Sequence, residues 1–229
     1  MNIYALQTAR KGSKSVPNKN ILAVNGHQLW THNARAANNC DLIKKTYIST
    51  DIQQIHEIWN KTIKRPKHLC GDNGSHYETI LHGLNYIEND IKDKVDILVI
   101  LLGNNNGATK KDLKGAINAL IKDPKADSIM SIGKYNMFNP YRAYKYKDGY
   151  AQTYVDQKIT KKATKSNHND KNAYGDTYFF NGSFWICRRE AIINNNGLLP
   201  FPWIGKNILM WEQDASIMEV DAEWQLKLM

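Results

Sequence analysis

Cysteine is scarce in this sequence. Its 229 residues include three cysteines, Cys40, Cys70 and Cys187. The set is odd in number and widely spaced, with no C-x-x-C pair and no histidine at zinc-ligand spacing, which excludes a disulfide scaffold and a zinc finger. We therefore expect reduced thiols with structural roles.

Long hydrophobic runs are also missing. No stretch approaches the roughly 20 apolar residues that a membrane-spanning helix requires. Residues 1–6 run directly into an arginine–lysine loop, with no apolar region of the kind that signal peptides carry. The sequence thus predicts a cytoplasmic protein without a membrane partner.

Acidic residues are in the minority. Lysine and arginine total 31 against 22 for aspartate and glutamate, which gives a formal net charge of +9. A positive surface attracts anionic partners such as phosphates, carboxylates or nucleic acid. The cations are spread along the chain without an arginine-rich arm or an RNP-like motif, so nucleic acid is not the expected partner, although a nucleic-acid-binding protein remains an alternative.

The order of predicted elements indicates the fold class. Hydrophobic side chains make up 42% of the chain, enough for one large domain over residues 1–229, and we see no linker that divides it. Strand-like and helix-like segments alternate, which predicts an α/β fold with a mostly parallel sheet and helices on both faces. The predicted strands span residues 2–8, 45–49, 96–102 and 127–133; the predicted helices span 29–38, 52–61, 75–87 and 109–122.

The pattern changes in residues 136–176. Tyrosines and Gly149 between two short alternating runs predict a protruding hairpin, and the polar residues 158–176 predict a mobile segment. After this insertion we expect strands at 178–187 and 217–220, a short helix at 189–194 and a closing helix at 222–229. His82 and the tryptophans 185, 203, 211 and 224 are expected to pack in the core.

A basic loop follows the first predicted strand. It reads Ala9-Arg10-Lys11-Gly12-Ser13-Lys14-Ser15-Val16-Pro17-Asn18-Lys19-Asn20. Backbone N–H groups around a glycine can cradle phosphate oxygens while arginine and lysine neutralise their charge. It is neither a Walker A loop nor a G-x-G-x-x-G fingerprint, and on charge pattern alone a solvated loop is the alternative.

This loop resembles the A-R-x-G-S-K-x-x-P-x-K-N signature of the CMP-sialic acid synthetase family, the N-acylneuraminate cytidylyltransferases. Further segments are similar to family motifs in the same order along nearly the whole chain. They are Ser49-Thr50-Asp51, Arg65-Pro66 with Leu69 and Asp72, Ser75, His82-Gly83-Leu84, Asn139-Pro140-Tyr141, Asn181-Gly182-Ser183 and Glu219-Val220-Asp221.

The resemblance implies a Rossmann-like nucleotidyltransferase fold and a cytidylyltransferase that uses CTP as co-substrate. It further implies catalytic roles for Arg10, Lys19 and Asp221, and a homodimer formed through the insertion at 136–176. The residues implied to bind CTP are Arg10, Gly12, Ser13, Lys14, Lys19, Asn20, Arg65 and Ser75.

Two carboxylates near the C-terminus suit a metal ion. Glu219 and Asp221 lie two apart in a predicted strand, so their side chains share one face. Hard oxygen ligands suit Mg²⁺, although a solvent-facing pair on an edge strand is equally compatible with the pattern. The family has aspartate at both positions and also where Gln225 stands, so its pattern implies Glu219 and Asp221 as the magnesium ligands.

The residues at positions where the family binds its acceptor differ from the family pattern. The family's L-Q-P-T-S-P-L-R is replaced after Leu102 by a loop containing Asn104, Asn105 and Asn106, and Phe179-Phe180 replaces a basic position. We expect CMP transfer to a small acidic acceptor, either a sialic acid-like 2-keto sugar acid or a divergent organophosphate or phosphonate, with release of pyrophosphate. Candidate acceptor-binding residues are Asn104, Asn105, Asn106, Arg142, Lys171 and Asn181. A catalytically inactive nucleotide-binding relative is the alternative.

Overall fold

A single twisted sheet organises the protein. The computed structural model describes residues 1–71, 73–164 and 167–227. Its seven-stranded sheet has the order β11-β7-β10-β6-β1-β4-β5, with every neighbouring pair parallel except the two pairs that β10 forms with β6 and β7. The predicted α/β class and mostly parallel sheet are therefore confirmed. The strands are β1 (Ile3–Ala9), β4 (Thr46–Thr50), β5 (Thr62–Lys64), β6 (Ile97–Leu102), β7 (Ser128–Lys134), β10 (Tyr178–Arg188) and β11 (Ile208–Glu212).

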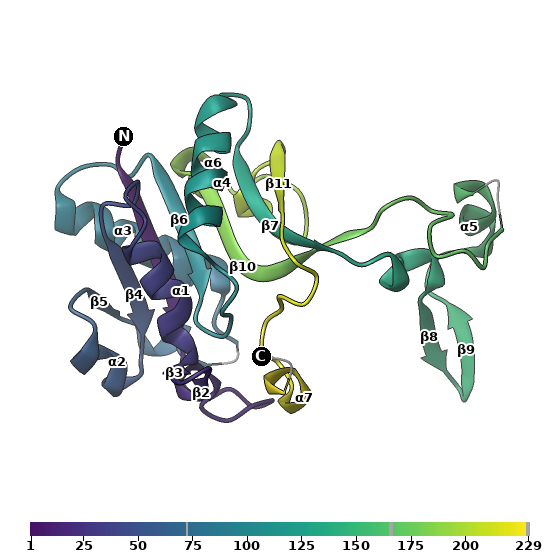
Figure 1. The fold of residues 1–229 in the computed structure, drawn as a ribbon, viewed down its shortest axis with the longest axis horizontal. Helices are drawn as coiled ribbons and strands as arrows, with labels where there is room; N and C mark the ends of the chain where they lie inside the picture. The colour runs from purple at the N-terminus through teal and green to yellow at the C-terminus, as the bar shows by residue number, and fades with distance from the viewer. Residues whose placement is uncertain (72, 165–166, 228–229) are drawn as a thin grey trace.

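Helices cover both faces of the sheet (Figure 1). The helices α1 (Leu29–Asn38) and α4 (Lys110–Lys122) pack on one face, through residues such as Ala37 and Ile117. On the other face lie α3 (His76–Ile91) and α6 (Arg189–Asn194), through residues such as Leu84 and Ile192. The central strand β6 is apolar throughout because both of its faces are covered.

Hydroxyl side chains cap the N-termini of α3 and α4. The side chain of Ser75 accepts a hydrogen bond from Glu78 N at 3.2 Å, and Thr109 accepts one from Asp112 N at 3.1 Å. These bonds satisfy backbone donors that have no partner inside the helix. The bounds predicted for α1 and α6 agree with the structure.

The region after β10 differs from the prediction. The predicted strand at 217–220 is wrong, because this segment is irregular, and the last sheet strand is β11, which pairs with β7. The predicted helix at 52–61 is shorter, since α2 (Gln53–Ile58) ends before β5 begins. The closing helix α7 covers Glu223–Leu226, and residues 228–229 of the prediction lie outside the described chain.

The insertion protrudes as an arm, as predicted. In Figure 1 it extends to the right of the sheet from the ends of β7 and β10. It contains a hairpin of β8 (Tyr144–Lys147) and β9 (Tyr150–Thr153). The segment predicted to be mobile contributes to a short helix, α5 (Gln157–Ala163), whose start is capped by Asp156. Among the arm's exposed apolar side chains are Phe138, which is 71% exposed, and Tyr146, which is 85% exposed.

Two small strands and five single-turn helices complete the described elements. The strands are β2 (Ala23–Val24) and β3 (His27–Gln28); the turns are η1 (Lys19–Ile21), η2 (Lys67–Leu69), η3 (Asn136–Phe138), η4 (Pro140–Arg142) and η5 (Pro202–Ile204). No helix in the described part of the chain has the length and apolar character needed to cross a bilayer.

Candidate active site

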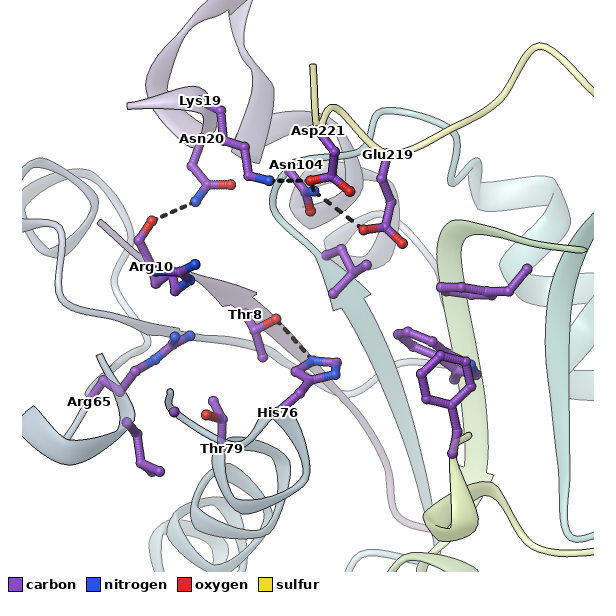
Figure 2. A pocket seen from close by; sticks show the side chains of 16 residues that line it. Thr8, Arg10, Lys19, Asn20, Arg65, His76, Thr79, Asn104, Glu219 and Asp221 are labelled. Carbon is purple, nitrogen blue, oxygen red and sulfur yellow. Dashed lines mark hydrogen bonds and ion pairs between the residues drawn. The ribbon is translucent and has the colours of Figure 1, made fainter. Parts of the chain in front are cut away.

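A cleft of about 390 Å³ opens beside the carboxyl ends of β1 and β6 (Figure 2). Ligands of open α/β sheets bind at this edge, because the loops that follow parallel strands converge there. The basic loop supplies one wall of the cleft through Arg10, Lys19 and Asn20. Glu219 and Asp221, about 200 residues away in the chain, lie across from that loop.

Local packing holds the basic loop in place. Val16 is buried against Val24, Leu29 and Val220, so the middle of the loop is anchored to the body of the protein. The single-turn helix η1 then begins at Lys19. The side chain of Asn20 is buried and donates a hydrogen bond from Nδ2 to the Arg10 carbonyl at 2.8 Å, which ties the end of the loop to its start.

Arg65 lies at the floor of the cleft and is only 7% exposed. Its Nη2 donates to the Ser49 carbonyl at 2.8 Å and its Nε to Ser49 Oγ at 3.3 Å. Burial lowers the pKa of the guanidinium, although the Asp51 carboxylate opposes the shift. An arginine remains charged even so. It therefore brings a fixed positive charge to a partly dehydrated site.

The acidic pair meets the basic loop directly. Lys19 Nζ and Asp221 Oδ1 are 2.5 Å apart, and Asn104 Nδ2 lies 3.4 Å from Glu219 Oε2 and 3.5 Å from Asp221 Oδ1 (Figure 2). Burial, together with the neighbouring Asp221, raises the pKa of Glu219. A cation placed between the two carboxylates would relieve their repulsion.

A glycine makes room for Glu219. Gly182 has φ +82, and a Cβ built on it would lie 2.0 Å from Glu219 Cγ. It sits where the pairing of β10 with β7 shifts register, between Phe180 and Trp185. A residue with a side chain would be strained at this position and would displace the carboxylate.

The donor set fits a magnesium ion. The described residues contain no cluster of three or more His, Cys, Asp or Glu side chains able to hold a metal. Two carboxylates are nevertheless sufficient for Mg²⁺, which keeps several waters and takes further oxygens from substrate phosphates. Glu219 and Asp221 would hold such an ion beside Lys19, where it would neutralise phosphate charge.

Aromatic side chains form another wall of the cleft, among them Trp185, which the sequence analysis expected in the core. Phe180 stacks on Trp185 with ring centroids 3.7 Å apart, and Phe201 meets Trp185 edge-on at 5.3 Å. Trp185 is only 2% exposed, and its indole Nε1 has no hydrogen-bond partner among the described residues. A buried donor without a partner is costly, so a ligand oxygen that reached this N–H would stabilise it.

Of the other aromatic residues expected in the core, Trp203 is buried as predicted. Trp211 is partly buried and His82 lies at intermediate depth. The prediction is wrong for Trp224, which is 57% exposed.

His76 also lines the cleft and was not predicted as a site residue. Its Nε2 is 3.4 Å from Thr8 Oγ1 (Figure 2). Its ring also contacts Trp185 and Trp203. Burial, with a smaller effect from Arg65, lowers the pKa of His76 to about 4. The imidazole is therefore neutral at physiological pH and can both donate and accept a hydrogen bond.

A second cavity of about 350 Å³ adjoins the first and shares Phe180, Glu219 and Asp221 with it. It lies at the root of the arm, and most of its remaining wall is aromatic or apolar. The residues that line only this cavity are Tyr135, Phe138, Phe179, Asn181, Met218 and Gln225. The two cavities therefore meet at the acidic pair.

The structure brings together most of the residues predicted to bind the nucleotide and the metal. Arg10, Lys19, Asn20, Arg65, Asn104, Glu219 and Asp221 all line the first cleft. Gly12, Ser13 and Lys14 belong to the same loop but are not among its lining residues. Ser75 uses its hydroxyl to cap α3, between the lining residues Gly74 and His76.

The predicted acceptor residues are more dispersed. Asn105 is fully buried; its Nδ2 donates to the Asn181 carbonyl at 3.0 Å and its Oδ1 accepts from Gly107 N at 2.7 Å, so its polar atoms act inside the protein. Asn106 lies outside both cavities, and Asn181 lines the second one. Arg142 and Lys171 are on the arm and line neither cavity.

Comparison with known proteins identifies the family. A family model described as cytidylyltransferase matches residues 5–193. The chain belongs to the cytidylyltransferase family. It is thus a nucleotidyltransferase, as the sequence resemblance predicted.

Relatives of this cytidylyltransferase cover nearly its whole length. The post-translational flagellin modification protein B of Campylobacter coli is 26% identical over 227 residues, which are 96% of this chain and 90% of that protein. The CMP-N,N'-diacetyllegionaminic acid synthase of Campylobacter jejuni is 24% identical over 226 residues, with the same two coverages. The structure of CMP:2-keto-3-deoxy-manno-octonic acid synthetase complexed with CTP has a TM-score of 0.67 at 16% identity and covers 99% of this chain and 96% of that one, which confirms the nucleotidyltransferase fold.

Proposed function

We propose that this cytidylyltransferase transfers CMP from CTP to a sugar acid and releases pyrophosphate. The observation that carries the proposal is the single cleft in which Arg10, Lys19 and Arg65 face the acidic pair Glu219 and Asp221. Cations on one side and carboxylates suited to a metal on the other match the charge of a metal-bound triphosphate. The family of this chain supports the use of CTP.

The reaction requires charge stabilisation and positioning. A hydroxyl oxygen of the acceptor attacks the α-phosphorus and gives up its proton to a basic group or water. The bond from the α-phosphorus to the bridging oxygen breaks, and pyrophosphate leaves with the electron pair. Arg10 and Lys19 lie where they can stabilise the charge that develops on the leaving group. Magnesium, when bound, neutralises phosphate oxygens. No covalent enzyme intermediate is needed.

The acceptor we propose is an N-acylated sugar acid. An aromatic wall suits methyl or deoxy groups, and the unpartnered Trp185 N–H suits an amide carbonyl oxygen beside them. The name of the Campylobacter jejuni relative supports this choice, since it specifies a diacetylated legionaminic acid.

Replacing Trp185 with phenylalanine tests this assignment. The change keeps an aromatic ring and removes the indole N–H. We expect the KM for an N-acylated acceptor to rise about three- to tenfold, the usual range for one lost hydrogen bond. The KM for CTP should stay within about twofold, because only the acceptor is expected to use this donor. Equal increases in both values would contradict the assignment.

A pyrophosphate-release screen tests the function itself. The protein is incubated with magnesium, each of the four ribonucleoside triphosphates, and sugar acids with and without N-acyl groups. Pyrophosphate release that requires both CTP and an N-acylated sugar acid is the expected result. Thermal stabilisation by CTP without turnover on any acceptor would instead indicate an inactive nucleotide-binding relative.

We further propose that the protein forms a homodimer through its arm. The arm's hairpin exposes Tyr144, Tyr146 and Tyr150, and its base exposes Met137 and Phe138. Such a concentration of apolar surface is typical of an interface. Light scattering at micromolar concentration should give about twice the 26.3 kDa mass of the chain.

Two arm variants sharpen this test. Tyr146→Asp combined with Tyr150→Asp should shift the protein to a monomer, because charges would be buried without partners at the interface. Lys147→Ala, on the same hairpin, serves as the control and should remain dimeric. A monomeric mass for the unmodified protein would refute the dimer.

A further inference from the structure

The C-terminal segment crosses back over the sheet edge to reach the basic loop (Figure 1). After β11 the chain turns at Asp214 and passes the site as an irregular strap, residues 213–222. Val220 N donates to the Asn104 carbonyl at 2.8 Å, and the Val220 side chain is buried beside Val16. The strap therefore reaches the site without the support of sheet pairing.

The position of the Asp221 carboxylate is set mainly by the backbone that carries it. Its side chain is 60% exposed, so little packing fixes its rotamer or its approach to Lys19. Asn104 contacts the strap from the sheet side. On the other side the strap continues into α7, a helix of four residues. A helix this short is not stable on its own and must be fixed by contacts at its ends.

Gln225 supplies that fixation. Its Oε1 accepts hydrogen bonds from both Asp221 N and Ala222 N, each at 2.6 Å. Ala222 occupies the N-cap position and has no polar side chain with which to cap the helix itself. The single amide oxygen of Gln225 therefore closes the turn that carries Asp221, and its Nε2 approaches Met218 Sδ at 3.6 Å across the same turn.

We propose that Gln225 is a positioning residue for the metal site: it holds the Asp221 peptide so that the carboxylate faces Lys19 and Glu219. This inference rests on the proposed use of magnesium and CTP. Gln225 places no charge beside the two carboxylates, so it fixes the turn without adding to their mutual repulsion. Loss of the amide oxygen would leave two backbone donors unpaired and free the turn to move.

Binding of CTP without any acceptor provides the test. Calorimetry gives the Kd for CTP in excess magnesium and again in EDTA, and the ratio of the two values measures the contribution of the metal. We expect Gln225→Ala to reduce this ratio about three- to tenfold, the usual effect of losing a helix cap. The Kd in EDTA should be unchanged or lower, since a loosened Asp221 competes less well for Lys19.

Two further variants make the result specific. Gln225→Glu retains an acceptor oxygen for both N–H groups and should keep the ratio at or above that of the unmodified protein. Glu223→Gln changes an exposed side chain on the same short helix, serves as the control, and should have no effect.

The possible outcomes are distinct. If Gln225→Ala weakens CTP binding equally with and without magnesium, its role is merely structural and the proposal is overturned. An unchanged ratio, or an unmodified protein that binds CTP without any metal dependence, overturns it as well. If the ratio behaves as expected but no acceptor yields pyrophosphate, the positioning role stands and the proposed reaction fails.

Discussion

Replacing Lys19 with alanine is expected to lower kcat by about 100-fold or more, a loss of about 2–4 kcal/mol of transition-state stabilisation. Lys19 is the cation of the basic loop that meets Asp221, and its side chain is only 15% exposed. In a partly dehydrated site, a positive charge stabilises a leaving group by far more free energy than it would at the surface. Steady-state pyrophosphate release at saturating CTP measures the effect. Arg10→Ala should behave similarly.

Lys11→Ala is the matched control for this loop. Lys11 is exposed, does not line the cleft, and contacts Asp51 through its backbone N–H, which alanine retains. It should keep nearly full activity. Wild-type kinetics in both Lys19→Ala and Arg10→Ala, in a preparation otherwise shown to be active, would remove the basic loop from the mechanism.

If Asp221 holds magnesium as proposed, Asp221→Asn should weaken magnesium binding by at least about tenfold, because it removes the charge of the carboxylate while keeping its shape. The resulting loss of activity should be partly recovered by raising the magnesium concentration, since mass action refills a weakened site. Activity measured over a magnesium titration tests this. Glu219→Gln should have a smaller effect, because its longer side chain departs from the pair of aspartates in the family pattern.

Without metal, we expect Asp221→Asn to have the opposite effect, a gain in affinity for CTP. Asp221 pairs with Lys19 at 2.5 Å, so its neutralisation should tighten CTP binding in EDTA by freeing the lysine for phosphate. This tightening should disappear when Lys19→Ala is combined with Asp221→Asn. If Asp221→Asn changes neither the magnesium dependence nor the turnover, the carboxylate is an exposed surface group, and the metal is held by CTP alone or by another carboxylate such as Asp51 or Asp214.

The nucleotide side of the site was accessible from sequence because its determinants are local. Residues 9–20 are continuous in the sequence after a buried strand, so their resemblance to a family signature could be recognised and a phosphate site expected there. The family pattern then linked this loop to Glu219 and Asp221, which the fold brings into contact. Asp72, part of another quoted motif, lies outside the described residues.

Long-range pairing explains what the sequence did not reveal. The strand β11 exists because Ile208–Glu212 pairs with β7, about 80 residues earlier, and no local pattern specifies that partner. Residues 217–220 show a short alternation, but the position beside β7 at this end of the sheet is taken by β11. The acidic pair therefore reaches the site on an irregular strap in place of the predicted strand.

The acceptor side was harder to predict for a related reason. An asparagine in a loop can bind a ligand or stabilise the protein, and only the fold decides between them. Asn105 connects its loop to the strand β10, whereas the unpartnered indole N–H of Trp185 lies within an apolar segment that reads as core. The departure of the 103–109 loop from the family pattern thus changes hydrogen bonds inside the protein as well as the lining of the cleft.

The way the arm is attached has an evolutionary consequence. Its two ends leave the sheet side by side, where Lys134 on β7 pairs with Tyr178 on β10 and Tyr135 N donates to the Thr177 carbonyl at 2.8 Å. An insertion bounded by adjacent strands can lengthen, shorten or be exchanged without shifting the register of the core. The surface proposed to form the homodimer can therefore diversify while the sheet that carries the cleft stays fixed.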